Sequence, residues 1–480
     1  MSLSNGISLP ALAFRLCPYL LLPALLCYAV SSNPVFLALP FAGLYGLLLL
    51  YRPRAAYFLL LAVLPFSTQV FFSGNSLSLT LPAEPMMWAF LALAVLLWLQ
   101  RPGAAALSQP VTLIILLQLA WLIPATLCSE VPLLSLKFLL AKTWMLGCFF
   151  LFPAWIFHRQ KDFRNGMLCL LIPVLLSVVI ILLRHAQFGF RFSAMNTATW
   201  FIYYNHVEYA TLLSMVLPLA YACWRLSRKR LWRGLAVAAI GLLLLAIFFS
   251  YARAAVLAVL FAAFMGIMLR ARIAAWILPA GYALLLLLVG YLTTGNRYIR
   301  LRPRYEQTRY HTDFSDHISA TFAGHDVSAM ERLHRWIAAL RMSRKRPLTG
   351  FGPNAFYYHY KPYALPSFRT YSSSNEEHST THNYFLYILA EQGYPGMILY
   401  ALLIAVVFAR AQATYNRFRD HIFYRHCVSA LVMMIAACLV NNFFSELIET
   451  PKIGALFYLG ISLLVLLDVK SREPVRNQEA

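Results

Sequence analysis

A histidine lies at the edge of an apolar run in the C-terminal third of the chain, which reads THNYFLYILAEQGYPG from Thr381 to Gly396. An unperturbed imidazole titrates at about pH 6.5, so at neutral pH His382 can take a proton from an attacking hydroxyl group. The sequence therefore predicts His382 as a general base. The alternative is a hydrogen-bonded helix cap, because Thr381 and Asn383 lie at the same helix start.

A metal site is a third interpretation of this histidine. His378 and His382 are four residues apart, with Glu376 and Glu377 beside them, and this spacing would place two ligands on one helical face. No third ligand occurs at a recognisable spacing, so we expect no metal. The sequence also contains no P-loop, nucleophile elbow or Asp-x-Asp site, and we expect no nucleotide as energy source.

Two arginines in breaks between apolar runs are the other candidates for chemistry. Arg191 lies in GFRFSAMN and Arg253 in FFSYARAAVL. Each could extend to the membrane interface and bind lipid phosphate, but a charge near the membrane is costly and tends to mark a ligand site. Both fall on the same predicted side as His382. Because guanidinium groups match phosphate oxygens in a bidentate way, we predict a shared pyrophosphate ligand.

Further polar residues on that side are predicted to bind substrate. Glu391 follows His382 by about two helical turns, inside the apolar run, and a structural role is as plausible for it as a functional one. The helical segment after Ser328 has a basic face, which is either part of the site or only an interfacial anchor. The predicted substrate-binding residues are His206, Glu208, Arg332, Arg335, Asn383 and Glu391.

These residues must be held by membrane-spanning helices. The chain has 480 residues, of which 61% are hydrophobic and 12% charged, and its mean hydropathy is +0.65. We recognise about 14 apolar runs of a length that crosses a membrane, and expect an all-α polytopic membrane protein with about 12 to 14 transmembrane helices. The runs are centred near Leu21, Ala42, Leu64, Leu93, Leu117, Cys148, Leu175, Val216, Leu242, Phe261, Leu285, Ala401, Met433 and Leu459.

The positive charge of the chain indicates its topology. The formal net charge of +22 would fit a nucleic-acid-binding protein. However, half of the 40 Lys and Arg residues fall in loops that are cytoplasmic if the N-terminus is cytoplasmic. The positive-inside rule then explains the basicity and places both termini in the cytoplasm. We therefore expect contacts with membrane lipids and no nucleic-acid partner.

One long hydrophilic segment interrupts the apolar pattern and falls on the outer side. Ser328 and Glu331 have capping-box spacing and are followed by apolar residues at helical spacing up to Pro347, which predicts a basic amphipathic helix at the membrane surface. We divide the chain into transmembrane helices 1 to 11 (1–294), a large outer loop (295–383), C-terminal transmembrane helices (384–469) and a cytoplasmic tail (470–480).

Four stretches resemble motifs of the O-antigen ligase and O-antigen polymerase superfamily of bacterial inner-membrane glycosyltransferases. THNYFLYILAEQGYPG is similar to the family's His-Asn-x-x-Leu...Glu-x-Gly-x-x-Gly stretch, and RPLTGFGPNAF is similar to its Pro-Leu-x-Gly-x-Gly segment. SYARAAVLA is similar to its Ser-x-x-Arg helix start. RFSAMN fits the arginine that precedes its central helix pair. The resemblance extends from about Arg191 to Gly396.

The resemblance implies a GT-C-like, multi-pass fold in the bacterial inner membrane, with the large loop and the active site facing the periplasm. It implies a glycan donor linked to undecaprenyl pyrophosphate and, in the ligases, an acceptor hydroxyl on lipid A-core. His382 would accept the proton of that hydroxyl, while Arg191 and Arg253 would stabilise the departing pyrophosphate. Since pyrophosphate is a good leaving group, neither a general acid nor a metal nor another cofactor is expected.

Other functions fit parts of the sequence. A polymerase of the same superfamily would join undecaprenyl-linked units, and a related enzyme would glycosylate a protein hydroxyl. The basic outer loop favours the ligase, whose acceptor is phosphorylated and anionic. A transporter or flippase of lipid-linked sugars would predict inverted repeats and polar residues near the bilayer midplane, which we do not recognise. A structural or assembly protein would not need His382.

Overall fold

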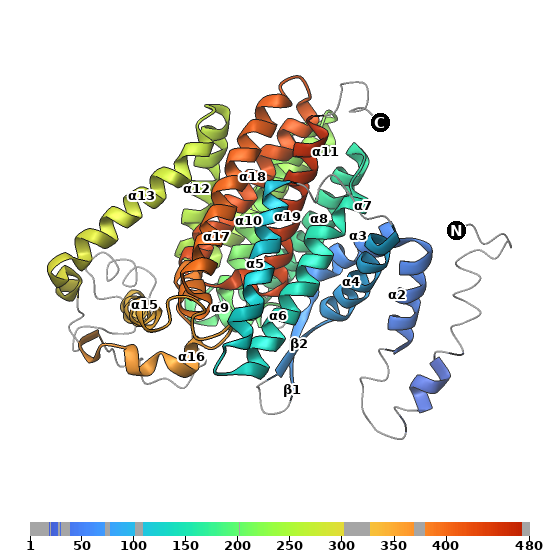
Figure 1. Cartoon of the computed structure of the whole chain (residues 1–480). Helices are drawn as coiled ribbons and strands as arrows, with labels where there is room; N and C mark the ends of the chain where they lie inside the picture. Colours follow the sequence, from blue (N-terminus) through green and yellow to red (C-terminus); the bar gives the residue numbers. More distant parts are fainter. Residues whose placement is uncertain are drawn as a thin grey trace.

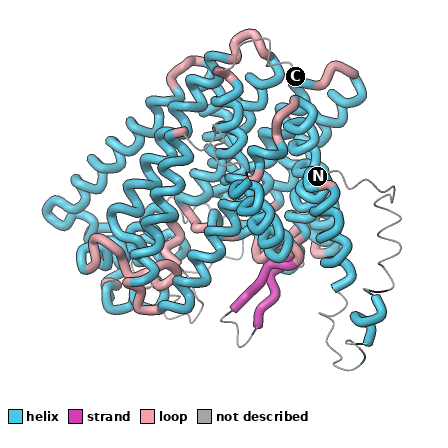
Figure 2. The backbone as a smooth tube through the Cα atoms, turned by 45° about the vertical axis from the view of Figure 1, so that its right-hand side comes forward, coloured by secondary structure: helices cyan, strands magenta, loops and turns pink. Residues whose placement is uncertain are grey.

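The computed structural model describes residues 19, 21–26, 29, 39–72, 77–100, 109–200, 202–301, 327–368 and 380–472. These residues form a helical bundle with a hairpin and a layer of short helices at one end (Figure 1). Figure 2 shows the hairpin at that same end. We call it the loop end, since it carries α15 (Val327–Lys345) and α16 (Phe356–His359), and call the opposite end, where α19 finishes, the tail end.

Ten helical segments of the described chain are long and apolar enough to cross a membrane. At about 1.5 Å per residue, a 20-residue helix such as α19 reaches the roughly 30 Å of a hydrocarbon core. The expected all-α polytopic fold is therefore confirmed. The segments are α5 (Pro110–Leu127), α6 with α7 (Pro132–Leu146, Pro153–Ile156), α8 (Gln160–Gln187), α10 (His206–Leu226), α11 (Arg230–Phe249), α12 (Arg253–Arg270), α13 (Ala274–Thr293), α17 (Tyr384–Arg417), α18 (Ile422–Phe443) and α19 (Pro451–Lys470).

In the described N-terminal part, three shorter apolar helices come before the ten long segments. The helices α2 (Leu39–Tyr51), α3 (Pro53–Val63) and α4 (Ala83–Gln100) are apolar, but their apolar stretches are shorter than those of the ten segments. After α3 the chain forms an antiparallel hairpin of β1 (Thr68–Phe72) and β2 (Leu77–Leu81). Hydropathy averaged over a run cannot show such breaks. The run predicted around Leu21 lies mostly outside the described residues.

The interior of the bundle is formed by α10, α18 and α19, while α13 lies on the outside (Figure 1). Gly266 of α12 faces Met433 of α18, and Gly460 of α19 faces Met434. Close approach at small residues supplies the packing that holds helices together where lipid surrounds them. A buried hydrogen bond of 2.9 Å from Asn441 to Ser214 adds a polar contact between α18 and α10.

The helix α15 lies across the loop end (Figure 1). Its buried Ala338 and Met342 pack with Phe356 of α16 and with Ala390 of α17. The apolar face of this amphipathic helix is therefore covered by protein. The covering segment includes residues 347–356, which we call the 347–356 loop.

Within α17 the helix breaks at Gly393, and the 347–356 loop fills the break. Gly393 has a φ of 74°, a left-handed conformation that favours glycine. The preceding carbonyl groups accept hydrogen bonds from the loop: Phe351 donates to Ala390 and Gly352 to Glu391, both at 3.0 Å. The two glycine-containing motifs of the sequence are thus one structural unit.

The contact is too close for side chains on its glycines. A Cβ atom on Gly350 would lie 2.3 Å from the carbonyl carbon of Glu391, and one on Gly393 would lie 1.9 Å from the carbonyl oxygen of Leu348. Both neighbours are backbone atoms, which cannot rotate away as a side chain can. Glycine is therefore required on both sides of the contact.

We expect Gly393→Ala to destabilise the protein. A left-handed backbone costs a non-glycine residue about 1–3 kcal/mol, and the added Cβ would also displace the 347–356 loop. The free energy of unfolding should fall by at least ~2 kcal/mol, measured as a lower midpoint of thermal denaturation in detergent. Gly241→Ala is the matched control, because its Cβ would meet no atom within 4 Å, and an unchanged midpoint for Gly393→Ala would contradict the prediction.

Candidate active site

Asn383 caps the first turn of α17 and leaves His382 just outside the helix. The side-chain oxygen of Asn383 accepts a hydrogen bond from the amide of Leu386 at 3.0 Å, and its nitrogen donates to the carbonyl of Phe443 at 3.0 Å. The capping role weighed for His382 therefore belongs to Asn383. His382 itself has a φ of 50°, and its side chain is 36% exposed, so a substrate can reach the ring.

The segment before α17 is fixed by α15. Trp336 donates a hydrogen bond of 3.0 Å from its indole nitrogen to the carbonyl of Thr381, and its ring meets that of Phe443 edge-on at 5.8 Å. Arg335 reaches the carbonyl of Thr380 at 3.4 Å. These contacts place the basic helix beside His382, and they tie α15, α17 and α18 together at the loop end.

Charges of both signs surround the imidazole of His382. Its Nδ1 lies 3.8 Å from the Glu446 carboxylate, which is beyond hydrogen-bonding distance. Partial burial of the ring, followed by the charges of Arg335 and Arg332, lowers the pKa of His382 below its usual value of 6.5. Burial also raises the pKa of the Glu446 carboxyl. The imidazole is therefore neutral at physiological pH and can accept a proton.

The structure brings the loops of Arg191 and Arg253 together. Tyr251 donates a hydrogen bond of 2.6 Å to the carbonyl of Phe190, and its ring meets that of Phe192 edge-on at 5.4 Å. Arg191 is exposed in this loop, and Arg253 is the first residue of α12 and half-buried. The segments that contain Arg191 and Arg253 are far apart in the sequence but contact each other through Tyr251.

Helix register relates Arg253 to His382. The antiparallel helices α12 and α18 meet where Gly266 faces Met433. At about 1.5 Å per residue along a helix, Arg253 lies about 20 Å from that contact along α12. Phe443, the last residue of α18, lies about 15 Å from the contact in the same direction. Since Phe443 accepts the hydrogen bond from Asn383, the Arg253 end of α12 and the His382 end of α17 both border the end of α18.

His206 and Glu208 begin α10 at the loop end, as expected, but their contacts are local. His206 Nδ1 lies 2.7 Å from the side-chain oxygen of Asn196. The Glu208 carboxylate is 5% exposed and accepts a 2.9 Å hydrogen bond from the amide of Tyr204. Glu208 therefore shapes the turn, while His206 is partly exposed.

Glu391 is buried in the contact between α17 and the 347–356 loop. Its carboxylate accepts hydrogen bonds from the amides of Asn354 at 2.6 Å and Phe356 at 3.0 Å, and it is 1% exposed. These bonds show a structural role. The substrate-binding role predicted for Glu391 remains a prediction, and substrate would have to displace the loop to reach it.

A buried ion pair beneath the site was not recognised in the sequence. Lys142 of α6 contacts the Glu449 carboxylate at 2.6 and 2.7 Å, and Glu449 also accepts a hydrogen bond from Tyr384, the residue after Asn383. The sequence did contain a sign of this ion pair, because a lysine inside an apolar run tends to be paired with an acidic residue. Glu446 was missed as well, because its place beside His382 depends on the fold.

The alternative of a metal site at His378 cannot be placed, since His378, Glu376 and Glu377 lie outside the described residues. Among the residues that are described, no group of three or more His, Cys, Asp or Glu side chains has the arrangement of a metal site.

We predict that Lys142→Met destabilises the protein strongly, because it leaves the charge of Glu449 unpaired. Breaking a buried pair costs about 3–5 kcal/mol, whereas replacing both partners can be nearly neutral. The double variant Lys142→Met/Glu449→Gln should therefore recover most of the lost stability. Thermal denaturation in detergent of the unaltered chain, Lys142→Met, Glu449→Gln and the double variant measures the coupling energy between the two residues. If the losses of stability in the two single variants simply add up in the double variant, the pair contributes nothing.

Comparison with known proteins finds a family model that matches part of the chain. Residues 238–401 match the model of the family described as O-antigen ligase. The match includes Arg253, α15, the 347–356 loop and His382, and it ends after the break in α17. A search of curated proteins gave no match. The match confirms the resemblance found in the sequence over residues 238–401.

Proposed function

We propose that the protein is an O-antigen ligase of the bacterial inner membrane, with its loop end, including residues 295–383, facing the periplasm. It would transfer a glycan from undecaprenyl pyrophosphate to a hydroxyl group of lipid A-core. The acceptor oxygen forms a bond to the anomeric carbon, the bond from that carbon to the pyrophosphate breaks, and undecaprenyl pyrophosphate leaves. The observation that carries the proposal is a neutral, accessible His382 at the end of the bundle where the two arginine loops join.

His382 acts as the general base. The imidazole takes the acceptor proton, and the imidazolium that forms lies close to the Glu446 carboxylate, which is 3.8 Å from Nδ1. Arg332 and Arg335 oppose this charge in the resting enzyme. A bound pyrophosphate offsets them, because a nearby negative charge favours the protonated imidazole. The base therefore becomes stronger when the donor is present.

Arg191 and Arg253 bind the pyrophosphate. Each guanidinium group can form two parallel hydrogen bonds to phosphate oxygens. Charge builds up on the leaving group as the glycosidic bond breaks, and fixed cations stabilise that charge most strongly at the transition state. No general acid is needed, because pyrophosphate leaves as an anion.

The acceptor is expected at the basic face of α15. Arg335 and Arg332 lie beside His382 on this helix, and a phosphorylated lipid A-core would be attracted to their charges. His206, which is partly exposed, is a second contact to substrate. Glu208, Asn383 and Glu391 support the site by holding backbone groups.

We expect His382→Ala to reduce glycan transfer by about 10²–10⁴-fold, the usual contribution of a general base. The assay supplies purified protein with undecaprenyl-pyrophosphate-linked glycan and lipid A-core, without metal or nucleotide. His158→Ala, an exposed histidine at the tail end, is the control and should retain full activity. A normal rate for His382→Ala would remove the base assignment, and product found only as longer polyprenol-linked glycan would identify a polymerase.

The pH profile tests the electrostatic setting of His382. Because its pKa is lowered, His382 stays unprotonated, and kcat/KM should remain level from pH 8 to about pH 5. The double variant Arg332→Gln/Arg335→Gln removes two positive charges and should raise the pKa of His382. On acidification, its activity should therefore begin to fall at a higher pH than that of the unaltered chain. Arg344→Gln, an exposed position on the same helix, is the control. If the pH at which kcat/KM falls on the acidic side is the same in the double variant and the unaltered chain, the proposed effect of the two arginines on His382 is wrong.

A further inference from the structure

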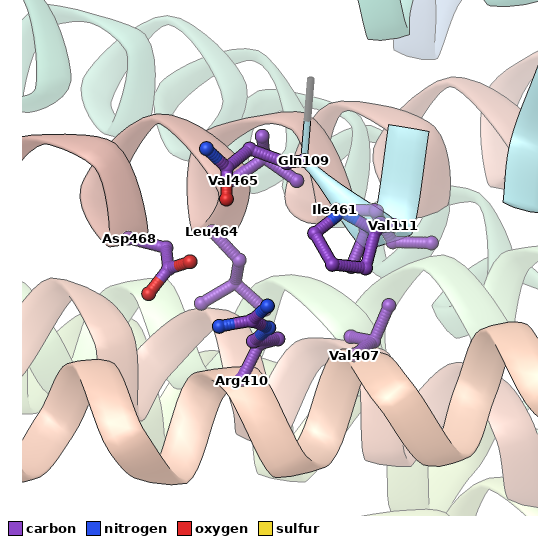
Figure 3. A pocket seen from close by; sticks show the side chains of 9 residues that line it. Gln109, Val111, Val407, Arg410, Ile461, Leu464, Val465 and Asp468 are labelled. Carbon is purple, nitrogen blue, oxygen red and sulfur yellow. The ribbon is translucent and has the colours of Figure 1, made fainter. Parts of the chain in front are cut away.

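A pocket lies at the tail end, between the start of α5, the last third of α17 and the end of α19. Figure 3 shows the polar side chains of Gln109, Arg410 and Asp468 around one space whose remaining wall is apolar. Its empty volume, which includes space open to the surroundings, is about 280 Å³, so the pocket is a shallow depression at the surface of the bundle.

The pocket has the depth and polarity of a lipid headgroup site. Asp468 lies two residues before the end of α19 and Arg410 seven before the end of α17, so both are close to the boundary of the hydrocarbon core. The apolar wall, which includes Val407 and Leu464, lies about one helical turn further toward the centre of the bundle. Charged groups at the boundary and apolar groups next to them match a headgroup followed by acyl chains.

The charges in the pocket favour an anion. Asp468 accepts a hydrogen bond from Thr414 at 2.9 Å and forms ion pairs with Arg417 and Arg472, which more than neutralise it. Arg410 lines the same pocket, yet its guanidinium has no hydrogen-bond or ion-pair partner among the described residues. A half-buried guanidinium without an acceptor is best satisfied by a phosphate group.

We propose that this pocket binds the phosphate of an anionic membrane phospholipid in the leaflet at the tail end. Arg410 contacts the phosphate, Gln109 offers a further polar group, and the acyl chains follow the apolar wall between α17 and α5. The bound lipid would join three helices that belong to different parts of the chain. This site lies at the opposite end of the bundle from His382 and is independent of the proposed transfer reaction.

Lipid titration of the purified full chain tests the proposal. Delipidated protein in detergent is titrated with phosphatidylglycerol, and bound lipid is counted by native mass spectrometry. We expect Arg410→Gln to weaken the tightest site about tenfold, as loss of a charge-assisted hydrogen bond would. Arg419→Gln removes an exposed arginine at the same end and should change nothing. Equal lipid affinity in Arg410→Gln and the unaltered chain would overturn the proposal.

Three comparisons distinguish the source of the anion and guard against a variant that does not fold. Phosphatidylcholine with the same acyl chains should bind more weakly, and equal binding would contradict recognition of an anionic headgroup. Inorganic phosphate should not displace phosphatidylglycerol, and full displacement would point to a free anion. In the unaltered chain, a photoreactive phosphatidylglycerol should label peptides that contain the pocket-lining parts of α5, α17 or α19. Labelling confined to other helices would overturn the proposed site.

Discussion

The broken helix α17 sets the arrangement of the whole loop end. Non-helical backbone at Gly393 removes helical partners from nearby carbonyl groups, and unsatisfied carbonyls are too costly to leave within a membrane protein's interior. The protein supplies donors from two distant segments: Phe351 bonds to Ala390 at 3.0 Å, and Trp121 of α5 bonds to the carbonyl of Gln392 at 2.9 Å. Because these bonds must all be made, they fix the position of the start of α17 relative to the 347–356 loop and α5.

The C-terminal helices contribute as much to the site as the segment that matches the family model. The short connection between α18 and α19 carries both Glu446, beside His382, and Glu449, which holds Tyr384. Asn383 is bound to the end of α18 through Phe443. Residues beyond 401 thus determine where the imidazole lies and which charges it meets. A histidine motif alone, without this connection, would specify a base but not its electrostatic environment.

The sequence predicted the parts of the protein that depend on local composition. The long apolar helices, the start of α17 at residue 384 and the resemblance to the O-antigen ligase family over residues 238–401 follow from hydropathy and short motifs. The hairpin after α3 was missed, because a polar break in an apolar run disappears when hydropathy is averaged. Glu446 and Lys142 were missed because their partners are distant in sequence. Glu391 was found, but its bonds to the amides of residues 354 and 356 depend on how the loop folds back.

Unusual backbone conformation occurs at or beside each of the three proposed catalytic residues. Non-glycine residues rarely adopt positive φ, and aromatic or bulky ones do so least readily unless the surrounding structure imposes it. Among the described residues, six non-glycine residues have positive φ: Phe190, Tyr251, Arg272, Asn296, Asn354 and His382. The values for Phe190, Tyr251 and His382 are 53°, 57° and 50°. Phe190 precedes Arg191, Tyr251 lies two residues before Arg253, and His382 is the proposed base. The bond between Tyr251 and Phe190 and the cap at Asn383 hold the conformations at these three positions, so the fold fixes the backbone where the proposed chemistry needs fixed side chains.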